Sequence, residues 1–185
     1  MNKTRTRDWG LGNWNRGEEG TMGLLEDLEQ VTRQEQELRM PRLDMQVAWD
    51  LGTRLRSMAV ERGLGIVIDV RRFGQPLFYT ALEGTTPDNP EWVRRKSNVV
   101  ARYHRSSYGM GLSLQSKGQT LEERGHAIAD FAAHGGSFPL HVEGAGIVGC
   151  VTVSGLPQRD DHELVVEALC AMLGKDYGAL KLTAE

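Results

Sequence analysis

Four consecutive residues, His134-Gly135-Gly136-Ser137, form the strongest candidate binding site in the sequence. An imidazole titrates and ligates metals near neutral pH, so His134 is the histidine that we expect to act on a ligand. The two glycines would let backbone N–H groups face that ligand without obstruction by a Cβ atom. A simpler interpretation is that Gly135 ends a helix and His134 caps its last carbonyl groups. We favour capping for the glycines and keep His134 as the leading functional histidine.

A second candidate begins at Ser154, where a strand is expected to end, and continues to His162 in the first turn of a helix. Helix N-termini attract anions, but Asp160, Asp161 and Glu163 would repel them. We therefore interpret the two aspartates as capping residues. The alternative is that the three carboxylates and His162 hold a divalent cation, since such ions prefer oxygen ligands.

A third candidate is a basic helix between residues 92 and 107. Arginine binds carboxylates and phosphates through paired hydrogen bonds, so this helix could hold an anionic ligand. The alternative is a solvated face, or a contact with another subunit that pairs with acidic residues such as Glu122, Glu123 and Asp130. The expected ligand-binding residues are Arg94 and Arg95, and the whole basic set is Arg94, Arg95, Lys96, Arg102 and Arg105.

Several familiar catalytic patterns are absent from the sequence. No two histidines have the HExxH spacing that places two metal ligands on one helical face. The glycines around Met110 lack the third glycine of a dinucleotide-binding loop. His104 lies near Ser106 and Ser107, but no acid is placed to orient it, which disfavours a hydrolase. Cys150 alternates with apolar residues on an expected strand, so we interpret it as a buried small hydrophobic residue.

The composition is that of an ordinary globular chain, and its length predicts one domain. The 185 residues include 25 Asp and Glu against 22 Lys and Arg, which gives a net charge of −3. This mild acidity disfavours a nucleic-acid binder. Two cysteines are too few for a secreted disulfide framework or a four-ligand zinc site, although one cysteine together with histidines could still bind a metal. The sequence has neither a long apolar run nor a signal-peptide core, so we expect a cytoplasmic protein with no membrane partner.

The first 21 residues are rich in Gly, Asn and Arg and have no helical or strand periodicity. We therefore expect residues 1–21 to form a disordered arm, and we hypothesise that Met22 is the natural start. The alternative is an arm that binds a partner through Trp9 and Trp14. Residues 22–185 are expected to form the single domain, which opens with an amphipathic helix over residues 22–38.

Hydrophobic periodicity predicts further helices and strands along the chain. Asp44 is a suitable N-cap for the next helix, and Gly63 ends it. Met110, Leu112 and Leu114 alternate with glycine or polar residues, which indicates a half-buried strand. Short turns that contain glycine join two pairs of strands into hairpins. In chain order, we expect a helix at 43–62, strands at 65–72 and 77–82, a loop at 84–90, a helix at 92–107, a strand at 110–115, a helix at 120–134, strands at 137–144 and 146–155, and a helix at 160–173.

The order of these elements favours an α+β fold, in which helices pack against an antiparallel sheet. Several local strings support a family resemblance: AWDLG at 48–52, IDVRRFGQPLF at 68–78, GTTPDNPEWVRRKSNVVARYHRSS at 84–107, AAHGGSFP at 132–139 and VTVSGLPQRDDHELVVEAL at 151–169. The stretch from Leu43 to Leu169 resembles the GlcG/HbpS-like superfamily, also called the haem-degrading-domain family, and most closely its UPF branch. The resemblance implies a five-stranded antiparallel sheet flanked by helices, in profilin-like or PAS-like layers, and a homo-oligomer in which helices and sheet edges meet neighbouring subunits.

The resemblance also suggests a cofactor. The superfamily includes modules associated with haem and corrinoids, and in some tetrapyrrole-binding relatives a histidine of the long N-terminal helix is an axial ligand. No histidine occurs between residues 43 and 62 of this chain. Binding of haem would therefore need another residue, and His134 and His162 are the candidates.

Two classes of function follow. The first is a homo-oligomeric module that binds haem or a related anionic tetrapyrrole, with the basic helix meeting the acid groups of the ligand. The second is a non-enzymatic assembly or protein-interaction protein. Haem degradation is a weaker third option, because only the family name suggests it and no residue indicates a redox role. Since the resemblance implies an oligomer, it favours the subunit-contact interpretation of the basic helix.

Overall fold

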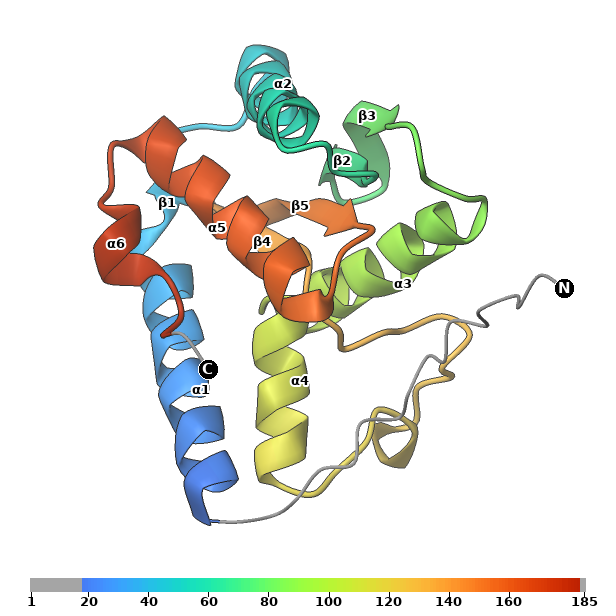
Figure 1. Cartoon of the computed structure of the whole chain (residues 1–185), viewed down its shortest axis with the longest axis vertical. Helices are drawn as coiled ribbons and strands as arrows, with labels where there is room; N and C mark the ends of the chain where they lie inside the picture. Colours follow the sequence, from blue (N-terminus) through green and yellow to red (C-terminus); the bar gives the residue numbers. More distant parts are fainter. Residues whose placement is uncertain (1–17, 184–185) are drawn as a thin grey trace, which may run out of the picture.

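A computed structural model describes residues 18–183 as one sheet with helices packed around it (Figure 1). Every expected strand pair and most of the expected helices are present, with shifts at their ends. In chain order the elements are α1 Glu18–Glu37, β1 Arg39–Met40, α2 Met45–Glu61, β2 Val67–Arg72, β3 Gln75–Ala81, α3 Asp88–Tyr103, α4 Ser107–Ser116, the short 3-10 helix η1 Glu122–Arg124, β4 Ser137–Val142, β5 Gly146–Ser154, α5 Gln158–Leu173 and α6 Tyr177–Leu180.

The sheet has five strands in the order β1-β4-β5-β2-β3. The hairpins β2–β3 and β4–β5 are antiparallel, as expected, and β2 also pairs antiparallel with β5. β1 runs parallel to β4, so the sheet is mixed and the expectation of a wholly antiparallel sheet was wrong. Sequence periodicity could not predict β1, because a strand of two residues has no alternation to detect.

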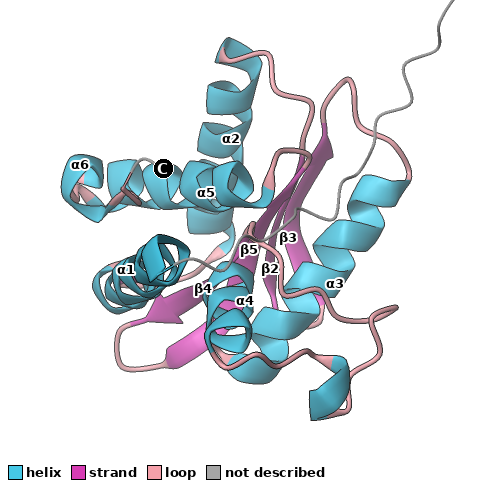
Figure 2. Cartoon of the chain, turned by 60° about the horizontal axis from the view of Figure 1, so that its bottom comes forward, coloured by secondary structure: helices cyan, strands magenta, loops and turns pink. Residues whose placement is uncertain are grey.

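Helices cover both faces of the sheet (Figure 2). α2 and α5 lie on one face, where the main hydrophobic core joins Leu51, Leu55 and Leu169 to Ile68 and Phe138. α3 lies on the other face, and its closest strand neighbours are β5 and β4. The residues of β2, β4 and β5 that point toward α3 include Asp69, Ser137 and Thr152, so this layer is more polar than the main core.

Residues 110–115 belong to α4, so the prediction of a strand there was wrong. The helix begins after Ser106, whose hydroxyl accepts a hydrogen bond from Gly109 N at 3.0 Å. Tyr108 and Leu112 pack with Val31 of α1, whereas Met110 and Leu114 pack with Val99 of α3. Because α4 is buried on two sides, its apolar residues recur at every second position and imitate the alternation of a strand.

The helix expected at 120–134 is also absent, and the chain there forms only η1 followed by a loop. Gly125 ends η1 with φ of 81°, and its N–H donates to Glu122 O. The rest of the loop is fastened to α3, since Ala132 N donates to Arg95 O at 3.1 Å and the Asn98 amide donates to Asp130 O at 2.8 Å. Contacts with α3, which is distant in sequence, therefore determine the conformation of this segment more than its local periodicity does.

The remaining element ends agree with the expectations to within a few residues. Asp44 is the N-cap of α2 and accepts a hydrogen bond from Val47 N at 2.8 Å, which confirms that prediction. α3 begins at Asp88 and ends before His104, which has φ of 53°. α1 begins at Glu18, within the range assigned to the arm. The rest of that arm, with Trp9 and Trp14, lies outside the described residues. Among the described helices, none has the length and apolar character needed to cross a membrane.

Candidate functional site

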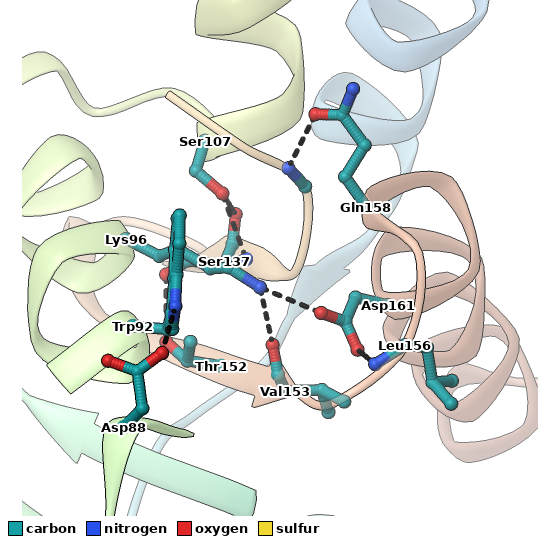
Figure 3. Close-up of polar contacts among 11 residues, drawn as sticks. Asp88, Trp92, Lys96, Ser107, Ser137, Thr152, Val153, Leu156, Gln158 and Asp161 are labelled. Carbon is teal, nitrogen blue, oxygen red and sulfur yellow. Dashed lines mark hydrogen bonds and ion pairs between the residues drawn. The ribbon is translucent and has the colours of Figure 1, made fainter. Parts of the chain in front are cut away.

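The Gly135–Gly136 turn brings the start of β4 against β5 and the beginning of α5 (Figure 3). A Cβ atom on Gly135 would lie 1.9 Å from Gln158 O, and one on Gly136 would lie 2.3 Å from Val153 O. Gly136 also has φ of 123°, which side chains rarely adopt. The glycines therefore allow close approach between backbones. The helix-ending interpretation of Gly135 was wrong, because no helix precedes it.

A buried ion pair lies directly beside this turn (Figure 3). The Nζ atom of Lys96, on α3, is 2.7 Å from Asp161 Oδ2, on α5, and donates to Val153 O at 3.2 Å. Lys96 and Asp161 expose only 3% and 1% of their surface. Burial lowers the pKa of Lys96 and raises that of Asp161 to about 6, and each partner's charge opposes the shift. The pair joins α3 directly to α5 beside the Gly135–Gly136 turn.

Three of the predicted site residues are structural. Asp161 does not cap α5 in solvent, because it is buried with Lys96 and its Oδ1 accepts from Leu156 N at 3.0 Å. Ser154 is 3% exposed. Ser137 is fully buried, its Oγ lies 2.8 Å from Thr152 Oγ1, and its N–H donates to a neighbouring hydroxyl. We therefore remove Ser137 and Ser154 from the ligand-binding set.

His162 is inaccessible, so the prediction that it binds a ligand was wrong. The side chain is fully buried, and Nε2 lies 2.8 Å from Gln34 Oε1. Burial, followed by the charge of Arg159, lowers the pKa of His162 to about 3, so the ring stays neutral. Glu163 accepts from Tyr177 Oη and from a backbone amide. The described residues contain no group of three or more His, Cys, Asp or Glu that could hold a metal ion, so they do not support the alternative of a cation site.

The predicted basic helix does not present its cations on one face. Lys96 points into the protein, and Arg94 is paired with Glu91 at 2.9 Å and with Asp130 at 3.0 Å. The pairing with Asp130 was among the expected alternatives, but it occurs within this one chain. Arg105 contacts Glu35 of α1. Arg94 is therefore already neutralised, whereas no carboxylate lies within ion-pair distance of Arg95 among the residues that the structure describes.

Trp92, Arg95 and His134 lie together at the surface, and we call them the His134 patch. The guanidinium carbon of Arg95 lies 4.5 Å from the centroid of the Trp92 ring. The exposed His134 ring meets Trp92 edge to face, with 5.3 Å between ring centroids. Trp92 Nε1 donates to Asp88 Oδ2 at 2.8 Å, which fixes the indole. Partial desolvation, followed by the charges of Lys96 and Arg95, lowers the pKa of His134.

A small hollow of about 110 Å³ opens beside the patch, between α4 and the start of α5. Ligand-binding pockets usually measure about 300–1,000 Å³, so this hollow could hold only a small part of a tetrapyrrole. Any such ring would lie mainly across the outside of the patch. The lining residues are Tyr108, Gly111, Leu112, Gln115, Ala133, His134 and Gln158.

Sequence reasoning missed the contributions of Lys96 and Trp92. A signal for Lys96 was available, because it lies three residues after Val93 and four before Val100, on the arc of α3 that faces the sheet. Its positive charge alone had grouped Lys96 with the surface arginines of the same helix. The contact between Trp92 and His134 could not be predicted, because the two residues are distant along the chain and nothing local in the sequence brings them together.

The comparisons with known proteins define the class of protein. An α+β domain with a mixed five-stranded sheet of this order matches the family model described as "Haem degrading protein HbpS-like" over residues 43–170. This chain belongs to the HbpS-like family. A UPF0303 protein of Acidobacterium capsulatum is 62% identical over 162 residues, which cover 87% of this chain and 98% of that protein. A UPF0303 protein of Burkholderia cenocepacia is 56% identical over the same coverage.

Solved structures share the fold of this chain. The Ybr137w protein has a TM-score of 0.74 at 29% identity, over 80% of this chain and 87% of that one. HbpS has a TM-score of 0.58 at 18% identity, over 74% and 93% of the two chains. A PduOC complex with haem has a TM-score of 0.60 at 16% identity, over 70% and 94%. The last two likenesses are too distant in sequence to carry more than the fold.

Proposed function

We propose that this chain binds haem, or a related anionic tetrapyrrole, at the His134 patch. The observation that carries the proposal is an exposed imidazole and a guanidinium that both contact one indole, the guanidinium having no carboxylate partner among the described residues. These side chains offer a metal ligand, an aromatic surface and a cation. A metal-bearing ring with carboxylate substituents is recognised by those three groups. The patch therefore fits the ligand that the family name suggests.

The protonation state of His134 suits a metal ligand. Its pKa is lowered, so the ring is neutral at pH 7 and one ring nitrogen has a free lone pair. When bound, haem would supply an iron atom that this nitrogen coordinates. The other candidate histidine, His162, cannot contact a ligand because its side chain is fully buried.

Arg95 would pair with a carboxylate of the ligand. No carboxylate of the described residues pairs with this guanidinium. A carboxylate of the ligand could therefore form a charge-assisted hydrogen bond with it. Arg95 Nε is buried and has no hydrogen-bond partner in the described part of the chain, so a carboxylate at the surface would pair with the other guanidinium nitrogens. Arg94 is expected to contribute little to ligand binding, since it already forms ion pairs with Glu91 and Asp130.

The buried contacts behind the patch would keep its residues in place. His134 directly precedes the Gly135–Gly136 turn, and Trp92 lies one helical turn before Lys96 on α3. The Lys96–Asp161 pair joins these two segments through α5. Preorganised contacts reduce the cost of ordering side chains when a ligand binds.

The small size of the hollow supports the proposal of a homo-oligomer. A tetrapyrrole on the His134 patch would leave much of its apolar ring in water, which is unfavourable. A second copy of the chain over the other side of the ring would bury that surface. The alternative function, a non-enzymatic assembly protein, is favoured by one separate observation, the open edge of the sheet at β3.

Adjacent arginines provide a matched test of this proposal. We expect hemin to bind saturably to the wild type, with a shift of the Soret band. Arg95→Gln should weaken binding at least about tenfold, since a hydrogen bond to a charged group contributes about 1.5–3 kcal/mol. Arg94→Gln removes the same charge from a residue that is already paired, so it should change the affinity by less than about twofold. Spectroscopic titrations of the three proteins measure the dissociation constants. Equal losses in the two variants would contradict the assignment.

A further inference from the structure

His134 belongs both to the His134 patch and to the hollow beside it, and the two surfaces share no other residue. Trp92 and Arg95 come from α3, whereas the rest of the hollow is lined by α4, by the start of α5 and by the residue just before His134. Figure 3 shows Trp92 and Gln158 on either side of the Gly135–Gly136 turn. A ring placed over His134 would therefore meet Arg95 at one edge and the hollow at another.

Two glutamine amides give the hollow its hydrogen-bonding groups. Gln158 Oε1 accepts from Gly135 N at 3.4 Å, which leaves the Nε2 atom of Gln158 as a donor. In Figure 3 this nitrogen points away from the turn. Gln115 is exposed, and its side chain has no hydrogen-bond partner among residues 18–183. None of the described residues that line the hollow is acidic, so both amides can donate to a carboxylate there.

The carboxylates of α5 do not oppose an anion in the hollow. Asp161 is buried and is paired with Lys96 at 2.7 Å. Glu163 accepts hydrogen bonds from the C-terminal segment. Asp160 is exposed and is not among the residues that line the hollow. The start of α5 beside Gln158 adds the positive end of a helix dipole, which favours a carboxylate further.

We propose that this protein prefers a metal-bearing tetrapyrrole with carboxylate side chains at two opposite edges of the ring, and that Gln158 determines this preference. Arg95 binds a carboxylate at one edge, and Gln158 binds a carboxylate at the other. The hollow measures about 110 Å³, which suits a side chain of a few atoms. Haem has both carboxylates at one edge and apolar vinyl groups opposite, so it would leave the amides of the hollow unpaired. This inference rests on the proposed function, because it places the ring over His134.

Iron coproporphyrin III is a matched probe for this preference, because it has propionate groups in the two positions where haem has vinyl groups. The wild type should bind it at least about tenfold more tightly than hemin, since a hydrogen bond to a charged group contributes about 1.5–3 kcal/mol. Titrations followed by the Soret band measure both dissociation constants. Equal affinities, or tighter binding of hemin, would overturn the preference.

Gln158→Glu tests the residue to which the preference is assigned. The substitution keeps an oxygen that can accept from Gly135 N, but it replaces the amide donor with a carboxylate that repels an acid side chain. Binding of iron coproporphyrin III should weaken at least about tenfold, whereas hemin affinity should change less than about threefold. Gln36→Glu makes the same change at an exposed residue of α1 and should leave both affinities unchanged. An undiminished preference in Gln158→Glu would contradict the role of Gln158.

The two proposals fail in different ways in these titrations. If both ligands bind equally tightly and both are lost in His134→Ala, the proposed function stands and the preference is wrong. If neither ligand binds to the wild type, the proposed function is wrong and the preference with it. Tighter binding of iron coproporphyrin III that Gln158→Glu abolishes would support both.

Discussion

Lys96→Met is expected to lower the free energy of unfolding by about 3–5 kcal/mol near pH 8, because it leaves the Asp161 carboxylate buried without its partner. Methionine keeps most of the side-chain volume, so the loss comes mainly from charge rather than packing. Urea unfolding measures the change. The control is Lys117→Met, an exposed lysine, which should alter stability by no more than about 0.5 kcal/mol. Similar effects in the two variants would mean that the buried pair does not hold α3 to α5.

The same variant should depend on pH in a defined direction. In the wild type the pKa of Asp161 is raised to about 6 from 3.8, so its stabilising contribution is present below 3.8 and is lost as pH rises through about 6. Removing the Lys96 charge raises this pKa further, because the main group opposing the shift is gone. The deficit of Lys96→Met relative to the wild type should therefore narrow as pH falls from about 8 to about 5. A deficit that widens in acid would contradict this coupling.

Gly136→Ala is expected to destabilise the protein by about 3 kcal/mol, at the upper end of the cost of overpacking. The new Cβ would lie 2.3 Å from Val153 O and 2.8 Å from Lys96 Nζ, at a φ of 123°. The control is Gly144→Ala in the β4–β5 turn, where φ is 73° but no atom lies within 4 Å. Gly144→Ala should therefore show only the backbone strain, about 1 kcal/mol. Thermal unfolding that ranks the two variants equally would show that close approach is not the reason for Gly136.

The parts of the fold that follow local rules could be predicted from the sequence. The N-cap of α2 and both hairpins depend on residues close together in the chain, such as Asp44 and the turn glycines. The family strings added the class of fold. α4 could not be predicted, because its alternating apolar residues reflect burial between α1 and α3 rather than the period of a strand. β1 is set by β4, which follows it by about a hundred residues in sequence.

The sequence singled out some residues of the candidate site and missed others. His134, predicted to be the leading functional histidine, lies at the surface, and its binding role stays a prediction; the glycines after it permit close backbone approach. His162 could not be separated from it by sequence, because both histidines lie at the ends of expected helices and only tertiary packing buries one of them. The difference between Arg94 and Arg95 likewise arises from a distant loop, which brings Asp130 to Arg94 and leaves Arg95 over Trp92.

One measurement tests the central proposal most directly: titration of hemin into the wild type and into His134→Ala, followed by the Soret band. His134→Ala should lose the saturable shift, or weaken binding by at least about tenfold, since it removes the only exposed imidazole in the patch. His104→Ala, which removes an exposed histidine that instead stacks on Phe73, should bind hemin as the wild type does. Saturable binding of equal affinity in all three proteins, or none in the wild type, would contradict a tetrapyrrole site at His134.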